Sequence, residues 1–474
     1  MAARVPSRLR LRSSQRGIVH HPDYPDSVRD DEKPEGRPLS GSAFARTARL
    51  ASLPVGFAGR TTLGLGKRIV GAPAQTVLDE VQRRTADQIF SVLGQLKGGA
   101  MKFGQAMSIF EAALPDELIG PYRETLTKLQ DSAPPMPPGV VHRVMVDEFG
   151  EDWRTQFPTF GDAPAASASI GQVHRATWHD GTEVAVKIQY PGAAKALTAD
   201  LRQIARMARL FGILAPALDV KPLIAELQDR VAEELDYSLE AGAQSVFAGA
   251  FADHPEVVIP EPLAHTERAL VSAWLEADSS LAQVIADGTQ EERDRYGEAY
   301  VRFLFAGPER AGMLHADPHP GNFRIMPDGR LGVVDFGAVA RLPDGLPESM
   351  GRLLRHAVDG DYARVVDGLH DEGFLKQGVN LDADTIARYI GPFTEPARVE
   401  RFTFNRDWMR AQMQRVSAPT AEGMGTAMKI NLPPQYLLIH RVWFGGIGVL
   451  SQLGATAPFR AILEESLPGF ADQG

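Results

Sequence analysis

Three oxygen-bearing side chains stand close together in the second half of the chain. Asp317 precedes Asn322 by five positions, and Asp335 opens an Asp-Phe-Gly sequence after a short apolar run. Phosphoryl transfer needs one carboxylate to orient the attacking hydroxyl, and an amide oxygen with a second carboxylate to hold Mg²⁺ against the phosphates. We therefore predict that Asp317 is the catalytic carboxylate and that Asn322 and Asp335 bind Mg²⁺.

A β-hairpin is predicted between the last two of these residues. Apolar side chains in residues 323–325 and 331–334 fit the period of two of short strands, and an Asp-Gly turn at residues 328–329 separates the two runs. Such a hairpin would return Asp335 beside Asn322. Each polar residue alone would be an ordinary loop side chain, whereas the combination indicates a kinase-like site.

A small-residue loop and a strand further upstream predict the phosphate-binding part. Backbone N–H groups approach phosphates closely only where side chains do not intervene, as in residues 166–172. A second hairpin is predicted here, in which an Asp180-Gly181 turn leads to a strand at residues 184–188. In that strand Lys187 faces away from the apolar side chains. This position favours contact with the α- and β-phosphates over an exposed lysine lying along the surface. The predicted nucleotide-binding residues of the loop are Ala166, Ala168, Ser169, Gly171 and Gln172.

A carboxylate is expected to fix the Lys187 ammonium. The candidate is Glu234, on a helix predicted from Pro222 through Ala241. Glu240 lies six positions later, on a different side of that helix, so both cannot neighbour one lysine. The strand predicted at residues 269–274 would lead to an interlobe hinge whose backbone meets adenine.

The composition excludes several classes of protein. A chain of 474 residues should split into two or three packed units. Hydrophobic residues at 44% and charged residues at 23% predict a folded globular protein. The absence of Cys excludes disulfides and thiolate zinc sites. The net charge of -10 argues against nucleic-acid binding by the whole chain.

The N-terminal region has a different charge balance. Residues 1–75 are rich in arginine, and they predict either contact with an anionic membrane surface or a solvated tail. We see no signal peptide and no uncharged apolar run of the roughly 18 residues that a membrane span needs. The expected location is cytoplasmic, with peripheral association at the inner membrane face.

Together these motifs resemble the UbiB-type atypical kinases, the AarF and coenzyme Q kinase-like family. The match covers roughly residues 76–345. Lys102-Phe103-Gly104-Gln105 corresponds to the family's KxGQ motif, and residues 234–236 with Glu240-Ala241 correspond to its ExD segment. The resemblance implies that Lys102 and Gln105 point into the nucleotide cleft.

The resemblance also implies an α+β, bilobal protein-kinase-like fold with an added helical KxGQ domain. The expected units are a basic tail at residues 1–75, a helical extension at 76–160, a β-rich N-lobe at 161–276 and a helical C-lobe at 277–474.

The implied function is that of an ATP- and Mg²⁺-dependent atypical kinase or ATPase. The implied partners are a lipid, an isoprenoid quinone precursor or quinone-biosynthesis proteins. Two alternatives stay open. The sequence His315-x-Asp317-x-His319-x-x-Asn322 also resembles small-molecule phosphotransferases of the aminoglycoside or choline kinase type. The other alternative is a nucleotide-gated lipid-binding scaffold.

Overall fold

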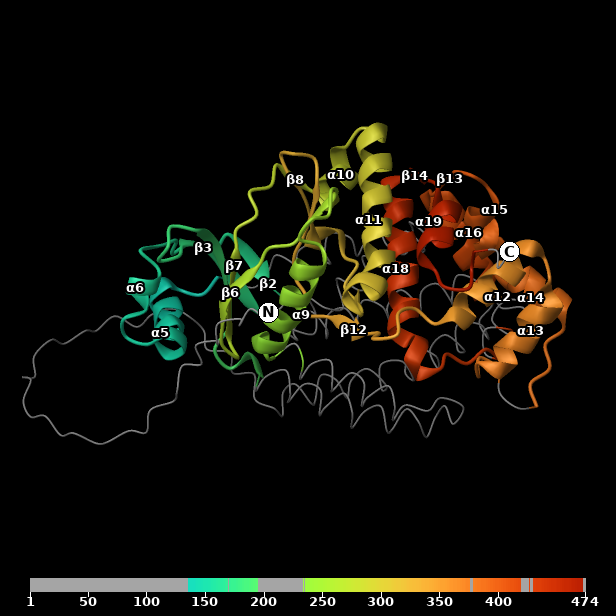
Figure 1. Ribbon diagram of the computed structural model, residues 1–474, viewed down its shortest axis with the longest axis horizontal. Helices are drawn as coiled ribbons and strands as arrows, with labels where there is room; N and C mark the ends of the chain where they lie inside the picture. The colour runs from blue at the N-terminus through green and yellow to red at the C-terminus, as the bar shows by residue number, and fades with distance from the viewer. Residues whose placement is uncertain are drawn as a thin grey trace, which may run out of the picture. The chain divides into compact units, whose positions relative to one another are not determined.

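The protein is described by a computed structural model covering residues 135–168, 170–194, 233, 235–375, 378–418, 426 and 429–471 (Figure 1). Within these residues a sheet-rich N-terminal part precedes a mainly helical C-terminal part. This content confirms the predicted α+β class. The expected tail, together with Lys102 and Gln105, lies outside the described residues, so the helical KxGQ extension stays a prediction.

An antiparallel sheet builds the N-terminal part. Its strand order is β1-β3-β4-β7-β6, with β2 paired to β3. The strands are β1 (Thr159–Phe160), β2 (Ala166–Ala168), β3 (Gly171–Thr177), β4 (Glu183–Gln189), β6 (Pro262–His265) and β7 (Ala269–Ala273). The pair β3 and β4 is the predicted hairpin. Its turn contains Gly181 with a φ of +93°, a conformation that glycine adopts without steric cost.

One face of this sheet is covered by helices α5 (Pro138–Phe149) and α6 (Trp153–Gln156). Their buried side chains share a single core with the apolar side chains of β4 and β7. Burying this face requires a partner, because an apolar sheet surface in water is unfavourable. The predicted domain boundary at residue 160 would separate residues 136–157 from the sheet with which they pack.

Helix α9 (Tyr237–Ala250) begins inside the range 222–241 for which the sequence predicted one continuous helix. The side chain of Asp236 accepts a hydrogen bond from the N–H of Ser238 at 2.9 Å and caps the helix. The predicted helix through residues 222–241 is therefore wrong near its end, because Asp236 has extended rather than helical dihedral angles. Residues 222–232 lie outside the described part of the chain.

Helix α9 links the two parts of the protein through its packing. Its first turn contacts the sheet, where Tyr237 lies in one cluster with Leu270 of β7. Further along the helix, Phe247 and Phe251 are buried in the core of the C-terminal part. A carboxylate in the first turn of α9 is therefore held close to the sheet.

Short strands follow in the C-terminal part. One sheet has the order β5-β11-β10-β8, and β9 pairs separately with β12, as β13 does with β14. The strands are β5 (Val257–Val258), β8 (Ser279–Ser280), β9 (Met313–His315), β10 (Phe323–Ile325), β11 (Leu331–Val333), β12 (Val339–Arg341), β13 (Phe402–Thr403) and β14 (Thr456–Ala457).

Helices make up most of the C-terminal part. They are α10 (Leu281–Asp287), α11 (Gln290–Ala311), α12 (Glu348–Asp359), α13 (Tyr362–Asp371), α14 (Ala383–Ile390), α15 (Glu395–Arg398), α16 (Arg406–Ser417), α18 (Leu437–Leu453) and α19 (Phe459–Ser466), with 3₁₀ turns η2 (Pro320–Asn322), η3 (Gly391–Thr394) and η4 (Pro434–Tyr436). Helix α11, yellow in Figure 1, runs beside the red α18. No helix in the described ranges has both the length and the apolar character needed to cross a bilayer.

Candidate functional site

The predicted hairpin after Asn322 is confirmed. Strands β10 and β11 pair in antiparallel fashion, with Phe323 opposite Val333. The N–H of Val334 then donates a hydrogen bond to the carbonyl oxygen of Asn322 at 2.9 Å. This bond brings the next residue, Asp335, alongside Asn322 as the sequence predicted.

Asp317 and Asn322 lie in one short loop and are buried, with exposed fractions of 3% and 8%. The Nδ2 atom of Asn322 donates to the backbone oxygen of Asp317 at 3.3 Å. Because this bond uses the amide nitrogen, the amide oxygen is the atom of Asn322 left to coordinate a cation. The loop therefore presents the two oxygen groups that the sequence assigned to it.

Helices α11 and α18 brace the Asp317 loop. The Tyr300 hydroxyl of α11 donates a hydrogen bond to the carbonyl oxygen of Pro318 at 2.8 Å. Burial and the charge of Asp317 raise the pKa of Tyr300 well above its ordinary value, so its hydroxyl stays protonated and remains a donor. From α18, Nη2 of Arg441 lies 3.9 Å from Oδ1 of Asp317.

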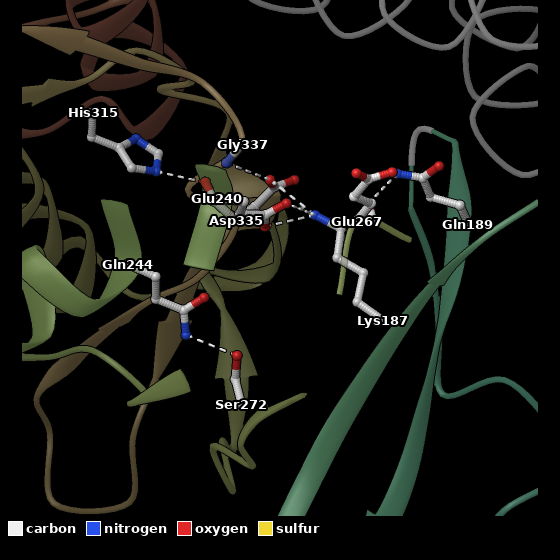
Figure 2. A network of polar contacts seen from close by, with 9 residues as sticks. All are labelled: Lys187, Gln189, Glu240, Gln244, Glu267, Ser272, His315, Asp335 and Gly337. Atoms are coloured by element: carbon white, nitrogen blue, oxygen red, sulfur yellow. Dashed lines mark hydrogen bonds and ion pairs between the residues drawn. The ribbon is translucent and has the colours of Figure 1, made fainter. Parts of the chain in front are cut away.

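Lys187 of β4 lies between two carboxylates, as Figure 2 shows. Its Nζ is 2.7 Å and 2.8 Å from the two carboxylate oxygens of Glu240, and 3.3 Å from Oδ1 of Asp335. Burial alone lowers the pKa of Lys187, but the charges of Asp335 and Glu240 raise it well above its ordinary value. The lysine is therefore held as a cation at a fixed position.

The backbone of Asp335 has an unusual conformation. Its φ is +65°, and no other non-glycine residue of the described chain has a positive φ. Such dihedral angles cost free energy and persist where the surrounding structure imposes them. The Oδ1 atom accepts a hydrogen bond from the N–H of Gly337 at 3.3 Å. The conformation aims the carboxylate of Asp335 at Lys187.

His315 forms a hydrogen bond with the backbone of Asp335. The imidazole is buried, and its Nε2 contacts the backbone oxygen of Asp335 at 2.9 Å (Figure 2). Because a carbonyl oxygen only accepts, Nε2 carries the proton. Burial lowers the pKa of His315 despite the nearby carboxylates, which favours the neutral ring. His315 thus acts as a neutral donor that holds the backbone of Asp335.

The predicted partner of Lys187, Glu234, stays a prediction, but the structure shows another glutamate at this lysine. Glu234 lies outside the described residues, and the glutamate that the structure places on Lys187 is Glu240. The physical reason is the start of α9 at Tyr237, which puts Glu240 in the first turn beneath β4. The ring of Tyr237, 5.0 Å from Nζ, adds a cation–π contact. Treating Asp236 as a helix cap would have found this partner from the sequence.

Three of the predicted loop residues share a face of the sheet with Lys187. In the strand register Val173 pairs with Lys187, Ala166 with Val173, and Ala168 with Gly171. Since paired residues of antiparallel strands point to the same face, these small residues line the Lys187 side. Ser169 lies outside the described residues.

Gly171 is also required by the packing of β3 on β4. A Cβ atom there would lie 2.0 Å from the carbonyl oxygen of Ile188, which is backbone and cannot move aside locally. The glycine therefore permits close approach of two strands, whatever its role toward a phosphate.

The prediction for the Gln172 side chain is corrected by its contacts. Gln172 is 1% exposed and lies on the opposite face of the strand from Lys187. Its Oε1 accepts from the N–H of Met136 at 2.8 Å, and its Nε2 lies 2.7 Å from Nε2 of His174. The side chain fastens the segment before α5 to the sheet, because alternation along β3 turns it away from the cleft.

The residues present fit a magnesium ion. Mg²⁺ prefers oxygen ligands and is held by one or two carboxylates together with phosphate oxygens and water. Asn322 and Asp335 supply an amide oxygen and a carboxylate from adjacent backbone segments. The described residues contain no group of three or more His or acidic side chains suited to a metal. A magnesium ion held here would take its other ligands from phosphate oxygens and water.

Tyr300 and Arg441 are the neighbours of Asp317 that sequence reasoning did not identify as parts of the site. Both reach Asp317 or its loop from elements distant in sequence. No local spacing signals such a contact.

Comparison with known proteins gives consistent matches. A family model described as the ABC1 atypical kinase-like domain matches residues 128–369. The chain is 30% identical over 352 residues to the Caenorhabditis elegans protein named atypical kinase coq-8, mitochondrial, covering 71% of this chain and 46% of that protein. It is 30% identical over 277 residues to the Saccharomyces cerevisiae atypical kinase COQ8, covering 57% and 54% of the two chains.

A solved structure is also similar over most of the chain. It is the complex of Rv3197 with erythromycin from Mycobacterium tuberculosis, with 42% sequence identity and a TM-score of 0.66. The match covers 84% of this chain and 100% of that one. The chain spans about half the length of the curated relatives that it matches. With the family model matching more than half of its residues, the chain belongs to the ABC1 atypical kinase-like family.

Proposed function

We propose that this chain is an ATP- and Mg²⁺-dependent atypical kinase or ATPase. The observation that carries the proposal is the position of Nζ of Lys187, in contact with Glu240 and Asp335. These residues come from β4, α9 and the segment after β11, so three distant parts of the chain converge there. A lysine held between two carboxylates beside a candidate magnesium ligand suits the polyphosphate of a nucleotide.

The residues then take separate roles. Lys187 binds the α- and β-phosphates, and Glu240 holds the lysine in place. Asp317 orients the hydroxyl of an acceptor, or a water molecule, and accepts its proton. Asn322 and Asp335 hold Mg²⁺, which when bound neutralises charge on the phosphate oxygens.

The small-residue loop and the KxGQ motif complete the proposed nucleotide site. Ala166, Ala168, Ser169 and Gly171 leave backbone N–H groups accessible to phosphates. Lys102 and Gln105 are assigned to the cleft by family resemblance, and they would restrain transfer to a peptide.

The names of the relatives support a proposal about the biological role. The curated relatives include atypical kinases named COQ8 and described as mitochondrial. We assign this chain to isoprenoid quinone biosynthesis or lipid homeostasis, at a membrane surface contacted by residues 1–75. A lipid or quinone precursor and quinone-biosynthesis proteins are the proposed partners.

A second candidate function is ligand binding without productive transfer. The related Mycobacterium tuberculosis structure holds erythromycin, and its 42% identity with this chain favours a comparable ligand here. In this scaffold, nucleotide binding would change the affinity for the ligand. Measuring erythromycin binding with and without Mg-ATP tests it, and an affinity that is equal in both conditions would contradict nucleotide gating.

The rival enzyme function is transfer to a small molecule. Aminoglycosides and choline can be tested as acceptors with labelled ATP. If one of these acceptors gave phosphorylated product in stoichiometric amounts, the chain would be a small-molecule kinase and the proposed role would be wrong.

The main experiment is phosphate release from Mg-ATP by the full chain, with and without anionic liposomes. We expect release that liposomes stimulate and that Asp335→Asn abolishes, because the variant loses the metal-binding charge. The matched control is Asp328→Asn on the same hairpin, whose carboxylate is exposed and paired with Arg330. Equal activity of Asp335→Asn and the unmodified chain would contradict the proposal. Bound nucleotide without release under any condition would favour the scaffold.

A further inference from the structure

Arg324 has a guanidinium that the described chain leaves without a polar partner. It lies on β10, two positions after Asn322, and is partly buried. It forms no hydrogen bond or ion pair with other residues of the structure as described. A guanidinium carries five donors and is costly to bury unpaired.

The side chain projects from the face of the hairpin that is turned away from the C-terminal core. Phe323 and Ile325, on either side of Arg324, are buried in the C-terminal core. Successive side chains of a strand point to opposite faces, so Arg324 points away from that core. Of its two cross-strand neighbours, Gly332 of β11 has no side chain and Ser280 of β8 has a small one.

The chain segment that joins the two parts of the protein lies over this face. A Cβ atom on Gly332 would be 3.0 Å from Cδ1 of Leu275, 3.1 Å from Sδ of Met326 and 3.2 Å from Cβ of Arg324. These three side chains therefore converge above Gly332. Leu275 lies two positions after the end of β7, in the segment predicted to be the hinge.

That segment is fixed at both ends. The N–H of Trp274 donates to the carbonyl oxygen of Glu183 in the N-terminal sheet at 2.9 Å. The N–H of Asp278 donates to the carbonyl oxygen of Ile325 in the hairpin, also at 2.9 Å. Arg324 consequently lies beneath the hinge, at the opposite end of the hairpin face from Asp335.

We propose that Arg324 stacks its guanidinium on the purine base of the bound nucleotide, an inference that rests on the proposed function above. Asp335 follows Gly332 by three positions, about 10 Å of near-extended chain, and the ribose and phosphates would lie along this span. The planar guanidinium stacks on aromatic faces and gains from a desolvated setting. The contact is made with the ring of the base alone, so it does not contribute to the binding of the phosphates.

The test compares Mg-ATP with inorganic magnesium tripolyphosphate, which lacks a base, as ligands of the full chain in equilibrium binding. We expect Arg324→Met to weaken Mg-ATP binding about 3- to 30-fold, the range for one cation–π stack. Its affinity for tripolyphosphate should be unchanged. Arg324→Lys keeps the charge without the planar group. Its affinity for Mg-ATP should lie between those of the unmodified chain and Arg324→Met. The control is Arg330→Met, at the exposed turn of the same hairpin.

The outcomes distinguish failure of the Arg324 stacking contact from failure of the proposed nucleotide-binding function. Unchanged Mg-ATP affinity in Arg324→Met would overturn the stacking contact while leaving the nucleotide site intact. An equal loss for Mg-ATP and tripolyphosphate would also overturn it, because the effect would then act on the phosphates or on the fold. No Mg-ATP binding by the unmodified chain would overturn the proposed function and this inference together.

Discussion

The ammonium of Lys187 contacts both carboxylate oxygens of Glu240, at 2.7 Å and 2.8 Å, and so joins β4 to the first turn of α9. Glu240 is 5% exposed and Lys187 16%, so water screens the pair little. Such a pair is stable only while both charges are present, because removing one leaves the other buried and unpaired. Nζ also lies 3.3 Å from Asp335, which makes the position of the lysine sensitive to α9 and to the Asp-Phe-Gly segment.

Replacing the glutamate tests this relationship. We expect Glu240→Gln to weaken kcat/KM for Mg-ATP by about 10- to 100-fold, the equivalent of one charged hydrogen bond. Steady-state phosphate release and nucleotide titration measure the change. Glu309→Gln, an exposed residue of α11 with the same change in charge, serves as the control and should leave both values unaltered. If Glu240→Gln left kcat/KM and the nucleotide affinity unchanged, Glu240 would have no role in the site.

Gly337 provides a second test, because a side chain there would press on both carboxylates. A Cβ atom would lie 3.2 Å from Oδ1 of Asp335 and 3.4 Å from Oε2 of Glu240. We expect Gly337→Ala to reduce the affinity for Mg-ATP by several-fold, about 1 kcal/mol, because the acids must shift away from Lys187. Isothermal titration calorimetry gives the affinity directly.

The control for that change is Gly249→Ala in α9. No atom lies within 4 Å of its added Cβ, and alanine favours a helix over glycine by up to about 1 kcal/mol. Gly249→Ala should therefore raise the unfolding temperature and leave nucleotide affinity unchanged. If Gly337→Ala behaved in the same way, the crowding argument would be wrong.

The hydroxyl of Tyr300 should matter for turnover more than for binding. Tyr300→Phe removes the donor to the carbonyl oxygen of Pro318 and should lower the free energy of unfolding by about 1 kcal/mol. Because this bond holds the Asp317 loop, we expect kcat to fall without a matching change in the Kd of Mg-ATP. Tyr296→Phe, one turn earlier in α11, is the control, since its hydroxyl forms no hydrogen bond in the described structure. Equal kinetics for both variants would contradict the role of Tyr300.

His174 should make the N-terminal part sensitive to acid. Its Nδ1 donates a hydrogen bond to the carbonyl oxygen of Gly161, so its Nε2 carries no proton and accepts a hydrogen bond from the side-chain amide of Gln172. Protonation of Nε2 would break this second hydrogen bond. Burial is the main cause that lowers the pKa of His174 below its ordinary value of 6.5. The unfolded chain therefore binds a proton below about pH 6.5 while the folded chain resists it, and stability falls as the pH falls.

Urea unfolding between pH 7.5 and pH 5 measures this effect. We expect the midpoint to decrease on acidification in the unmodified chain and to decrease less in His174→Gln. His179→Gln, at an exposed position in the β3–β4 turn, should keep the full pH dependence. A pH dependence that is identical in all three chains would exclude His174 as its source.

The sequence by itself determined the local elements of the site. The alternation around Lys187, the Asp-Gly turns and the spacing from Asp317 to Asp335 predicted two hairpins and the residues they bring together, and both hairpins are present. These features depend on neighbouring residues, since strand alternation and turn chemistry act over a few positions.

Only the tertiary structure decided which distant side chains meet. Glu240 became the partner of Lys187 because α9 begins at Tyr237 and packs under the sheet. Gln172 was assigned to the nucleotide yet fastens residues before α5, because burial of one sheet face requires that segment. Such choices follow from packing and the desolvation of charges between elements far apart in sequence, and no local spacing records them.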